Sequence, residues 1–134
     1  MSAICKDRVV IITGAGGGLG ASYAHAFAAE GAKVVVNDIN EAAAQSTVDA
    51  IKAAGGEAIV NTSDITNYAD SENAVKQAIE AYGTLHVVVN NAGVCRDRMF
   101  ASMTEAEWDT VIAVHLKGHF CIASHAVHYW RDQS

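Results

Sequence analysis

Short runs of β-branched residues alternate along this chain with longer segments in which apolar residues recur with a helical period. The short runs show no polar alternation, which is typical of parallel strands that are covered on both faces. This pattern predicts four buried strands, at 9–12, 34–36, 58–60 and 87–89.

Between the predicted strands, apolar residues recur at spacings of three and four, as they do along one face of a helix. We expect each of these stripes to pack against a sheet. The stripes consist of Leu19, Tyr23, Ala26 and Phe27, of Ala44, Val48 and Ile51, and of Val75, Ala78, Ile79 and Tyr82. Gly31, the Gly55-Gly56 pair and Gly83 follow the three stripes, where a left-handed helix cap favours glycine.

A fourth helix is predicted to begin at Thr104, whose hydroxyl can cap the helix while Glu107 completes a capping box. It is expected to run to about Trp130, with a kink near Gly118. Strands that alternate with helices of crossover length predict a parallel sheet with right-handed connections. The predicted fold class is therefore α/β, a doubly wound parallel sheet (Rossmann) of three layers, and we expect residues 1–134 to form one domain.

The composition of the chain is apolar and acidic. Its 134 residues are 51% hydrophobic and include 9 Lys and Arg against 15 Asp and Glu, a formal net charge of −6. This charge argues against a nucleic acid or an anionic membrane surface as a partner, and no apolar run approaches the roughly 20 residues of a membrane span. Cys5, Cys95 and Cys121 lack CxxC spacing and are interpreted as free thiols in a reducing compartment, so we predict a cytoplasmic location.

A glycine-rich loop, 13–20, lies between the first predicted strand and the first predicted helix. Glycines at such a turn let the backbone approach a pyrophosphate, whose charge then faces the N–H groups at the helix start. A P-loop for nucleoside triphosphates is excluded because the loop does not end in Gly-Lys-Ser/Thr. The candidate cofactor-binding residues in this loop are Gly14, Gly17, Gly18, Leu19 and Gly20.

Asp38 closes the second predicted strand, 18 residues after Gly20, where a carboxylate can accept hydrogen bonds from an adenosine ribose. The alternative interpretation is a solvated aspartate at a strand end. A ribose 2′-phosphate would add about two negative charges beside Asp38, and neither Gly17 nor Ile39 supplies a compensating cation. We therefore predict NAD rather than NADP as the cofactor.

Two more motifs follow the third and fourth predicted strands, Asp64-Ile65 and Asn90-Asn91-Ala92-Gly93. Together with the glycine loop and Asp38, they make the chain resemble the short-chain dehydrogenase/reductase family over essentially its whole length. Within that family, residues 91–100 and 108–120 look most like the hydroxyacyl-CoA dehydrogenase portion of peroxisomal multifunctional enzyme type 2 and its bacterial relatives. Bacterial 3-oxoacyl carrier-protein reductases are similar to nearly the same degree.

The resemblance implies roles for further residues around the adenosine half of a dinucleotide. For Asp64 the implied role is adenine binding, which also has a physical basis, since a carboxylate accepts hydrogen bonds from an exocyclic amine. For the asparagine pair, turn chemistry alone is the alternative. The implied roles are adenine binding by Asp64 and Ile65, lining of the ribose by backbone groups of Asn90, Ala92 and Gly93, and contact with the adenosine by Val114.

The main catalytic residues that the family needs are not in this chain. The resemblance implies a Ser after a fifth strand, which polarises the carbonyl, and a Tyr-x-x-x-Lys in the next helix, whose Tyr is the general acid or base. None of the four tyrosines has a lysine four positions later. His115 stands where the family usually has an asparagine whose backbone carbonyl holds a water of the proton relay, so His115 is the one catalytic candidate.

These features predict an NAD-dependent oxidoreductase that interconverts a secondary alcohol and a ketone by hydride transfer, with only its cofactor half present. An acyl thioester is one candidate for the small-molecule substrate. Arg96, Arg98 and Lys117 would suit the phosphates of an acyl-CoA, with ordinary solvated side chains as the simpler interpretation. The alternative function is a non-catalytic NAD-binding module or an inactive fragment, which the missing Tyr-x-x-x-Lys favours.

The fourth predicted helix is rich in side chains that can bind metals. His115 and His119, and likewise Cys121 and His125, have the i, i+4 spacing that allows two residues to share a metal ion. No carboxylate or distant ligand accompanies them, and buried or interface histidines are the simpler interpretation. We therefore predict no metal site.

The predicted sheet would be incomplete. In the usual doubly wound order of 3-2-1-4-5-6, a sheet that stops after the fourth strand leaves the apolar segment 85–89 as an open edge. Long hydrophobic edges pair or aggregate. We therefore expect the chain to be the amino-terminal half of a longer dehydrogenase, truncated after the fourth helix, or to form a homo-oligomer through that edge.

Overall fold

Four parallel strands form one sheet in the computed structural model, which describes residues 3–133. The order across the sheet is β3-β2-β1-β4, so the winding direction reverses after β3 and β4 returns to the free side of β1. The predicted doubly wound α/β class is confirmed. The strands are β1 (Val9–Thr13), β2 (Lys33–Asn37), β3 (Glu57–Asn61) and β4 (Val87–Val89). The helices are α1 (Gly18–Ala29), α2 (Glu41–Ala53), α3 (Tyr68–Tyr82), the 3₁₀ helix η1 (Phe100–Ser102), α4 (Glu105–Ile112), the π-helical segment η2 (Ala113–Lys117) and α5 (Gly118–Asp132).

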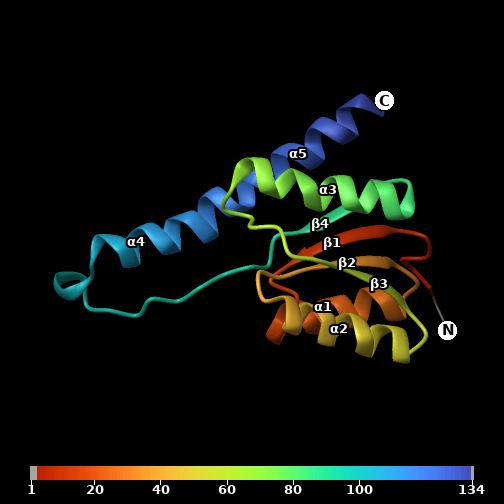
Figure 1. The fold of residues 1–134 in the computed structure, drawn as a ribbon, viewed down its shortest axis with the longest axis horizontal. Coiled ribbons are helices and arrows are strands. Elements are labelled where there is room, and N and C mark those ends of the chain that lie inside the picture. The colour runs from red at the N-terminus through yellow and green to blue at the C-terminus, as the bar shows by residue number, and fades with distance from the viewer. Residues whose placement is uncertain (1–2, 134) are drawn as a thin grey trace.

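Helices cover both faces of the sheet, α1 and α2 on one face and α3 and α5 on the other (Figure 1). Because successive residues of a strand point to opposite faces, β1 contributes to two separate cores. Val10 and Ile12 belong to the core on the side of α1 and α2, whereas Val9 and Ile11 belong to the core on the side of α3 and α5. The three predicted layers are therefore present.

The first three strands repeat at a constant interval along the chain. Val9 pairs with Lys33 and Lys33 with Glu57, so equivalent positions are 24 residues apart. At the other end of the strands, Thr13 lies beside Asn37 and Asn37 beside Asn61. This register places the carboxyl ends of the three strands at the same level and brings the loops after them to one edge of the sheet.

The burial of the strands depends on their place in the sheet. All five residues of β1 are buried, whereas the three residues of β4 are only half-buried. The prediction of fully buried strands is therefore wrong for β4, and also for β3, where Ile59 and Val60 are half-buried, because each of these strands has one neighbour among the described strands. The predicted open edge at this strand is confirmed.

The predicted contact face of α1 is wrong for the first half of the helix, whereas Phe27 packs against the core as predicted. Leu19 and Tyr23 are 68% and 40% exposed, whereas Gly20 and Ala24 are buried. Two small residues let the helix approach the rest of the molecule closely, and a search for large apolar residues does not detect such a face. The stripes predicted for α2 and α3 are confirmed by the burial of Ala44, Val48, Ile51, Val75 and Ala78.

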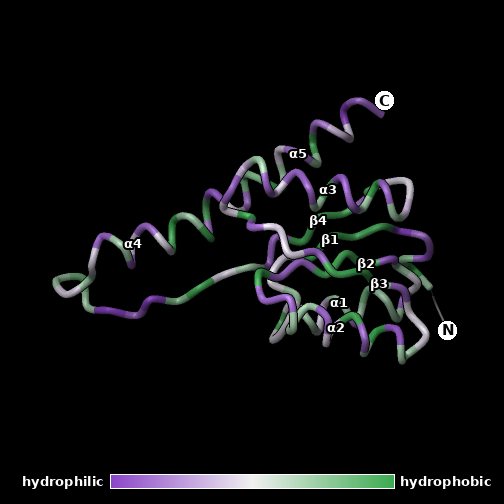
Figure 2. Tube along the Cα trace, in the orientation of Figure 1, coloured by the Kyte–Doolittle hydropathy of each residue, from purple (hydrophilic) through white to green (hydrophobic). Residues whose placement is uncertain are grey.

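Residues 95–112, which we call the arm, project away from the body of the molecule (Figure 1). The arm consists of an extended segment, η1 and α4, and it mixes polar and apolar residues where the central strands are mainly apolar (Figure 2). The predicted capping box at its helix is confirmed. The Thr104 hydroxyl accepts from the Glu107 N–H at 3.2 Å, and the Glu107 carboxylate accepts from the Thr104 N–H at 3.0 Å.

The helix that starts in the arm continues through η2 into α5. The predicted kink near Gly118 is wrong, because the irregularity is the π-helical segment that ends just before it and Gly118 itself has ordinary helical angles. A Cβ on Gly118 would lie 3.0 Å from Cδ1 of Ile65. Glycine at this position therefore allows the long helix to contact the loop after β3.

Candidate functional site

A cavity of about 540 Å³ opens at the carboxyl edge of the sheet. The loops after all four strands and one residue of η2 line it. A crevice where the strand order reverses is the usual ligand site of doubly wound sheets. The lining residues are Gly14, Gly17, Leu19, Asn37, Asp38, Ile39, Ser63, Asp64, Ile65, Thr66, Asn91, Ala92, Gly93, Val94 and Val114.

The glycine loop combines close approaches at its ends with open space at its centre. Gly14 has a φ angle of +63°, and a Cβ there would lie 2.8 Å from Cα of Ala92. A Cβ on Gly20 would strike the carbonyl oxygen of Gly14. By contrast, a Cβ on Gly17 or Gly18 would meet nothing within 4 Å. The ends of the loop are thus packed, while the backbone of Gly17 is open to a ligand in the cavity.

Two backbone amides hold the carboxylate of Asp38. Its Oδ2 accepts from the Gly16 N–H at 3.0 Å and its Oδ1 from the Asn40 N–H at 2.9 Å. A Cβ on Gly16 would lie 2.7 Å from that Oδ2, so this contact requires glycine. Gly16 is not among the predicted site residues, although its place inside the glycine run is a signal for it. Asp38 follows the last residue of β2 rather than closing the strand as predicted.

A hydrogen-bonded connection joins the glycine loop to the loop after β4. The Thr13 hydroxyl accepts from the N–H groups of Asn91 and Ala92, both at 3.0 Å. The Asn91 amide donates to the carbonyls of Thr13 and Gly14 at 3.0 and 3.3 Å. Asn91 therefore supports the cavity wall, although it is not among the predicted site residues. Asn90 does not line the cavity, and its buried Oδ1 has no hydrogen-bond partner among residues 3–133.

Asp64 is oriented from two sides at the opposite wall of the cavity. Its Oδ1 accepts from the N–H and the hydroxyl of Thr66 at 2.9 and 2.7 Å, and its own N–H donates to Asp70 Oδ2 at 2.7 Å. Ile65 beside it is 7% exposed and belongs to the core under α3 and α5. The arrangement presents a fixed carboxylate next to an apolar side chain.

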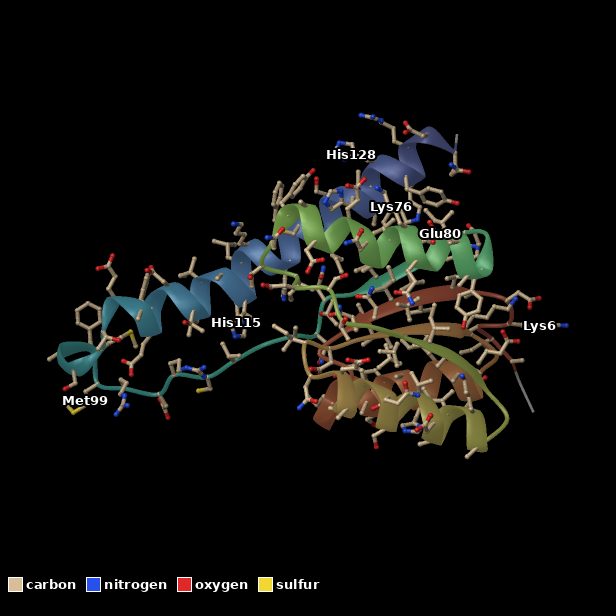
Figure 3. The ribbon with its side chains drawn as sticks, in the orientation of Figure 1. Lys6, Lys76, Glu80, Met99, His115 and His128 are labelled. Atoms are coloured by element: carbon tan, nitrogen blue, oxygen red, sulfur yellow. The ribbon has the colours of Figure 1, made fainter. Side chains whose placement is uncertain are left out.

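His115 extends from η2 toward the loop after β4 (Figure 3). Its Nε2 lies 3.0 Å from the backbone nitrogen of Val94 and 2.8 Å from the backbone oxygen of the same residue. The ring also packs on Gly93, where a Cβ would lie 2.7 Å from the ring carbon Cε1. Gly93 and Val94 line the cavity and His115 does not, so the imidazole contacts this wall from behind.

The other histidine and cysteine side chains of the long helix contact different parts of the protein. Nε2 of His125 lies 2.7 Å from the backbone oxygen of Tyr68, and Cys121 is buried. Nε2 of His119 is buried without a hydrogen-bond partner in the described part of the chain. Within that same part, no three His, Cys, Asp or Glu residues gather as metal ligands.

The arginines of the arm bind protein groups. Arg98 Nε donates to Glu107 Oε1 at 3.0 Å and so joins the extended segment to α4, while Arg96 donates to the Cys95 carbonyl. The hydrogen bond from the Thr104 backbone, assisted by Arg98, holds the pKa of Glu107 below its ordinary value. Neither arginine lines the cavity.

The structure thus brings most of the predicted cofactor residues to one cavity, while their roles toward a cofactor stay predictions. Gly18, Gly20 and Asn90 are predicted residues that do not line it. Open backbone at Gly17 and a carboxylate at Asp38 fit the phosphate and ribose groups of a dinucleotide. The predicted residues that line the cavity are Gly14, Gly17, Leu19, Asp38, Asp64, Ile65, Ala92, Gly93 and Val114.

The sheet, its reversal after β3 and the cavity at the reversal define a Rossmann-like α/β protein, a class that binds nucleotides at this place. Residues 8–134 match the family model of the short chain dehydrogenases. The chain therefore belongs to the short-chain dehydrogenase family, as its motifs indicated. Membership implies an oxidoreductase family and a nicotinamide nucleotide cofactor.

Relatives within the family agree with the predicted resemblance. The chain is 45% identical over 96% of its length to the hydroxyacyl-CoA dehydrogenase ChsB1 of Mycobacterium tuberculosis, of which it covers 42%. It is 42% identical over 95% of its length to peroxisomal multifunctional enzyme type 2 of Drosophila melanogaster, of which it covers 22%. The crystal structure of a short chain dehydrogenase from Mycobacterium avium matches with a TM-score of 0.93 and 52% identity, over 96% of this chain and 49% of that one. The chain thus spans half or less of the length of these relatives.

Proposed function

We propose that this chain is the cofactor-binding half of an NAD-dependent oxidoreductase that interconverts a secondary alcohol and a ketone. The observation that carries the proposal is the cavity at the reversal of the sheet, which is lined by the open backbone of Gly17 and by the carboxylate of Asp38. When bound, the nicotinamide ring would accept or supply the hydride. The described residues supply the binding groups.

Asp38 supports NAD over NADP. Each of its two oxygens accepts one backbone N–H, and a carboxylate oxygen has capacity for a second donor such as a ribose hydroxyl. Among the described residues that line the cavity, none is lysine or arginine. A 2′-phosphate would therefore bring about two negative charges next to a carboxylate with no cation to compensate them.

In this proposal each predicted residue binds the cofactor, shapes a loop around it or holds a water. The N–H groups of Gly17 and Gly18 face the pyrophosphate at the start of α1. Asp64 accepts from the exocyclic amine of adenine, and the backbone carbonyl of His115 holds a water of the proton relay. The residues that shape the loops around the adenosine are Gly14, Leu19, Gly20, Ile65, Asn90, Ala92, Gly93 and Val114.

The proposed substrate is an acyl thioester, and the proposed state is a homo-oligomer. The first point is supported by the name of the hydroxyacyl-CoA dehydrogenase relative, and the second by the open edge at β4. No helix within residues 3–133 is long and apolar enough to cross a membrane. The cytoplasmic location stays a prediction, and the names of several relatives contain the word peroxisomal.

Fluorescence titration of the chain with NADH and with NADPH tests the proposed function. We expect NADH to bind at least about tenfold more tightly, which corresponds to about 1.4 kcal/mol. Asp38→Ala should weaken NADH binding by about tenfold and reduce the preference, since it removes a charge-assisted acceptor. Asp49→Ala on the exposed surface of α2 is the matched control and should change neither affinity. Tighter binding of NADPH by the unmodified chain would overturn the preference.

A binding module without chemistry is the second candidate function. The observation that favours it is the absence of a lysine four positions after any tyrosine of this chain. An assay of NADH consumption with a short 3-oxoacyl thioester separates the two candidates. NADH binding without turnover supports the module for this chain, whereas turnover above background supports an enzyme.

A further inference from the structure

One ring nitrogen of His115 faces both polar backbone atoms of Val94. Nε2 lies 3.0 Å from the Val94 nitrogen and 2.8 Å from the Val94 oxygen. The backbone N–H is a donor, whereas the carbonyl oxygen is an acceptor. A single imidazole nitrogen carries either a proton or a lone pair, so it can satisfy only one of these two atoms at a time.

The choice between the two bonds affects the cavity, because Gly93 and Val94 are part of its wall. The His115 ring packs so closely on Gly93 that a Cβ there would lie 2.7 Å from Cε1. The ring is itself attached to η2, whose Val114 lines the same cavity. A change in the bond between Nε2 and Val94 therefore alters the contact between two walls of the cavity.

We propose that His115 is a positioning residue that holds the Gly93–Val94 wall through one of two mutually exclusive hydrogen bonds. In the neutral ring with its proton on Nδ1, Nε2 has a lone pair and accepts from the Val94 N–H. With a proton on Nε2, the ring donates to the Val94 carbonyl and leaves the N–H without this partner. The consequence for NADH binding rests on the proposed function, whereas the exchange of bonds is a property of the chain alone.

Glutamine at position 115 can form both hydrogen bonds, because its donor and its acceptor are different atoms. Its carboxamide extends about as far from the backbone as Nε2 of histidine and carries an oxygen acceptor and a nitrogen donor as separate atoms. His115→Gln can therefore serve the N–H and the carbonyl of Val94 at the same time and does not titrate. His115→Ala removes both bonds.

Other titratable or charged groups lie close along the same two segments. On the loop they are Cys95, Arg96 and Asp97, and on the helix they are Lys117 and His119. Both variants retain all of these groups. A pH dependence that the unmodified chain shows and His115→Gln does not show is therefore due to His115.

Amide exchange of Val94, measured by NMR on the ¹⁵N-labelled chain between pH 5 and 8, tests the exchange of bonds without any cofactor. After correction for intrinsic exchange, we expect protection of the Val94 amide to fall by about three- to tenfold as the pH is lowered, the range for one net hydrogen bond. His115→Gln should remain protected at both ends of the range, and His115→Ala at neither. Equal protection in all three proteins at both pH values would overturn the proposal.

NADH titration of the same three proteins at pH 6 and pH 8 tests the consequence for the cavity. The affinity of the unmodified chain should fall by about three- to tenfold at the lower pH relative to that of His115→Gln. If none of the proteins binds NADH, the proposed function fails, and the amide exchange of Val94 still decides the exchange of bonds. If all three bind NADH equally at both pH values, the positioning role is overturned and the proposed function stands.

Discussion

At the scale of single residues, two glycines with positive φ angles stand under different constraints. Gly14 has a φ angle of +63° and lies against Ala92, whereas Gly55 has a φ angle of +89° and open space around it. Both positions disfavour a side chain because of the backbone conformation. Only Gly14 adds a close approach, which is the one that joins the glycine loop to the loop after β4.

Replacing each glycine by alanine separates the cost of the backbone conformation from the cost of the close approach. Gly55→Ala should lower the free energy of unfolding by about 1–2 kcal/mol, the cost of a left-handed backbone at a non-glycine residue. Gly14→Ala should lower it by about 2–4 kcal/mol, since the new methyl group must also displace Ala92. Urea unfolding of both variants measures the difference. Equal losses would contradict the close approach in the structure.

At the scale of secondary-structure elements, buried amides connect β2, β3 and α3 below the cavity. Asn37 is only 2% exposed. Its side-chain amide donates to Asn61 Oδ1 at 2.7 Å and to the Ser63 carbonyl at 3.0 Å. Asn61 donates in turn to Gln77 Oε1 at 2.8 Å, and its Oδ1 also accepts from the Ser63 N–H at 3.1 Å. Asn61 is therefore the central member of the network.

Asn61→Ala should destabilise the protein more than Gln77→Ala. The first change removes the partner of two buried donors, which costs about 2–4 kcal/mol at 1–2 kcal/mol for each. Gln77 is only half-buried, and water can replace it in part, so about 1 kcal/mol is expected for that change. Thermal and urea unfolding measure both values. A larger loss for Gln77→Ala would contradict the central position of Asn61.

The stability of the first turn of α4 should depend on pH through Glu107. Its pKa in the folded arm is lowered by the hydrogen bond from Thr104 and by Arg98. A carboxyl with a lowered folded pKa stabilises the helix start at pH values above its unfolded pKa, and this contribution is lost as the pH falls through the folded pKa. Amide exchange at 105–108, corrected for intrinsic rates, should therefore be faster at pH 3 than at pH 6. Glu107→Gln should remove this dependence, whereas Glu105→Gln, in the same turn but outside the capping box, should retain it.

The elements that the sequence predicted well are those with local signals. The strand at Val87–Val89 and the cap at Thr104 follow from neighbouring residues alone. The first half of the α1 face could not be predicted from large apolar residues, because its buried members are Gly20 and Ala24. The same holds for the residues of the site. Asp38 could be predicted from its place after a strand, whereas the hydrogen bond from Asn91 joins residues 78 positions apart. Contacts of that kind exist only once the chain has folded.

At the scale of the whole molecule, an apolar surface runs along the long helix. Its residues are spaced by four and are exposed, and β4 leaves one edge of the sheet without a neighbour in the described chain. Apolar surface of this kind marks interaction sites on soluble proteins. We call it the helix stripe, and it consists of Trp108, Ile112, Leu116 and Phe120.

The helix stripe should drive association of the chain. Leu116→Asp places a charge in the stripe and should shift the molecule toward monomer, because a charge in an apolar interface loses its hydration. Ile4→Asp is the matched control, since Ile4 is similarly exposed but lies outside the stripe. Sedimentation velocity over a range of protein concentrations measures both. A homogeneous monomer of the unmodified chain at every concentration would contradict the prediction.

The π-helical turn at 113–117 changes the angles at which these four side chains leave the helix. In an α-helix each residue advances by about 100°, so a step of four residues overshoots a full turn by about 40° and a row spaced by four slowly winds around the axis. The wider π turn advances less per residue and winds the row back between Ile112 and Leu116. In a regular α-helix, the three steps from Trp108 to Phe120 would together wind the row by about 120° around the axis. The π turn therefore keeps Trp108 and Ile112 closer to the side of the helix that carries Leu116 and Phe120.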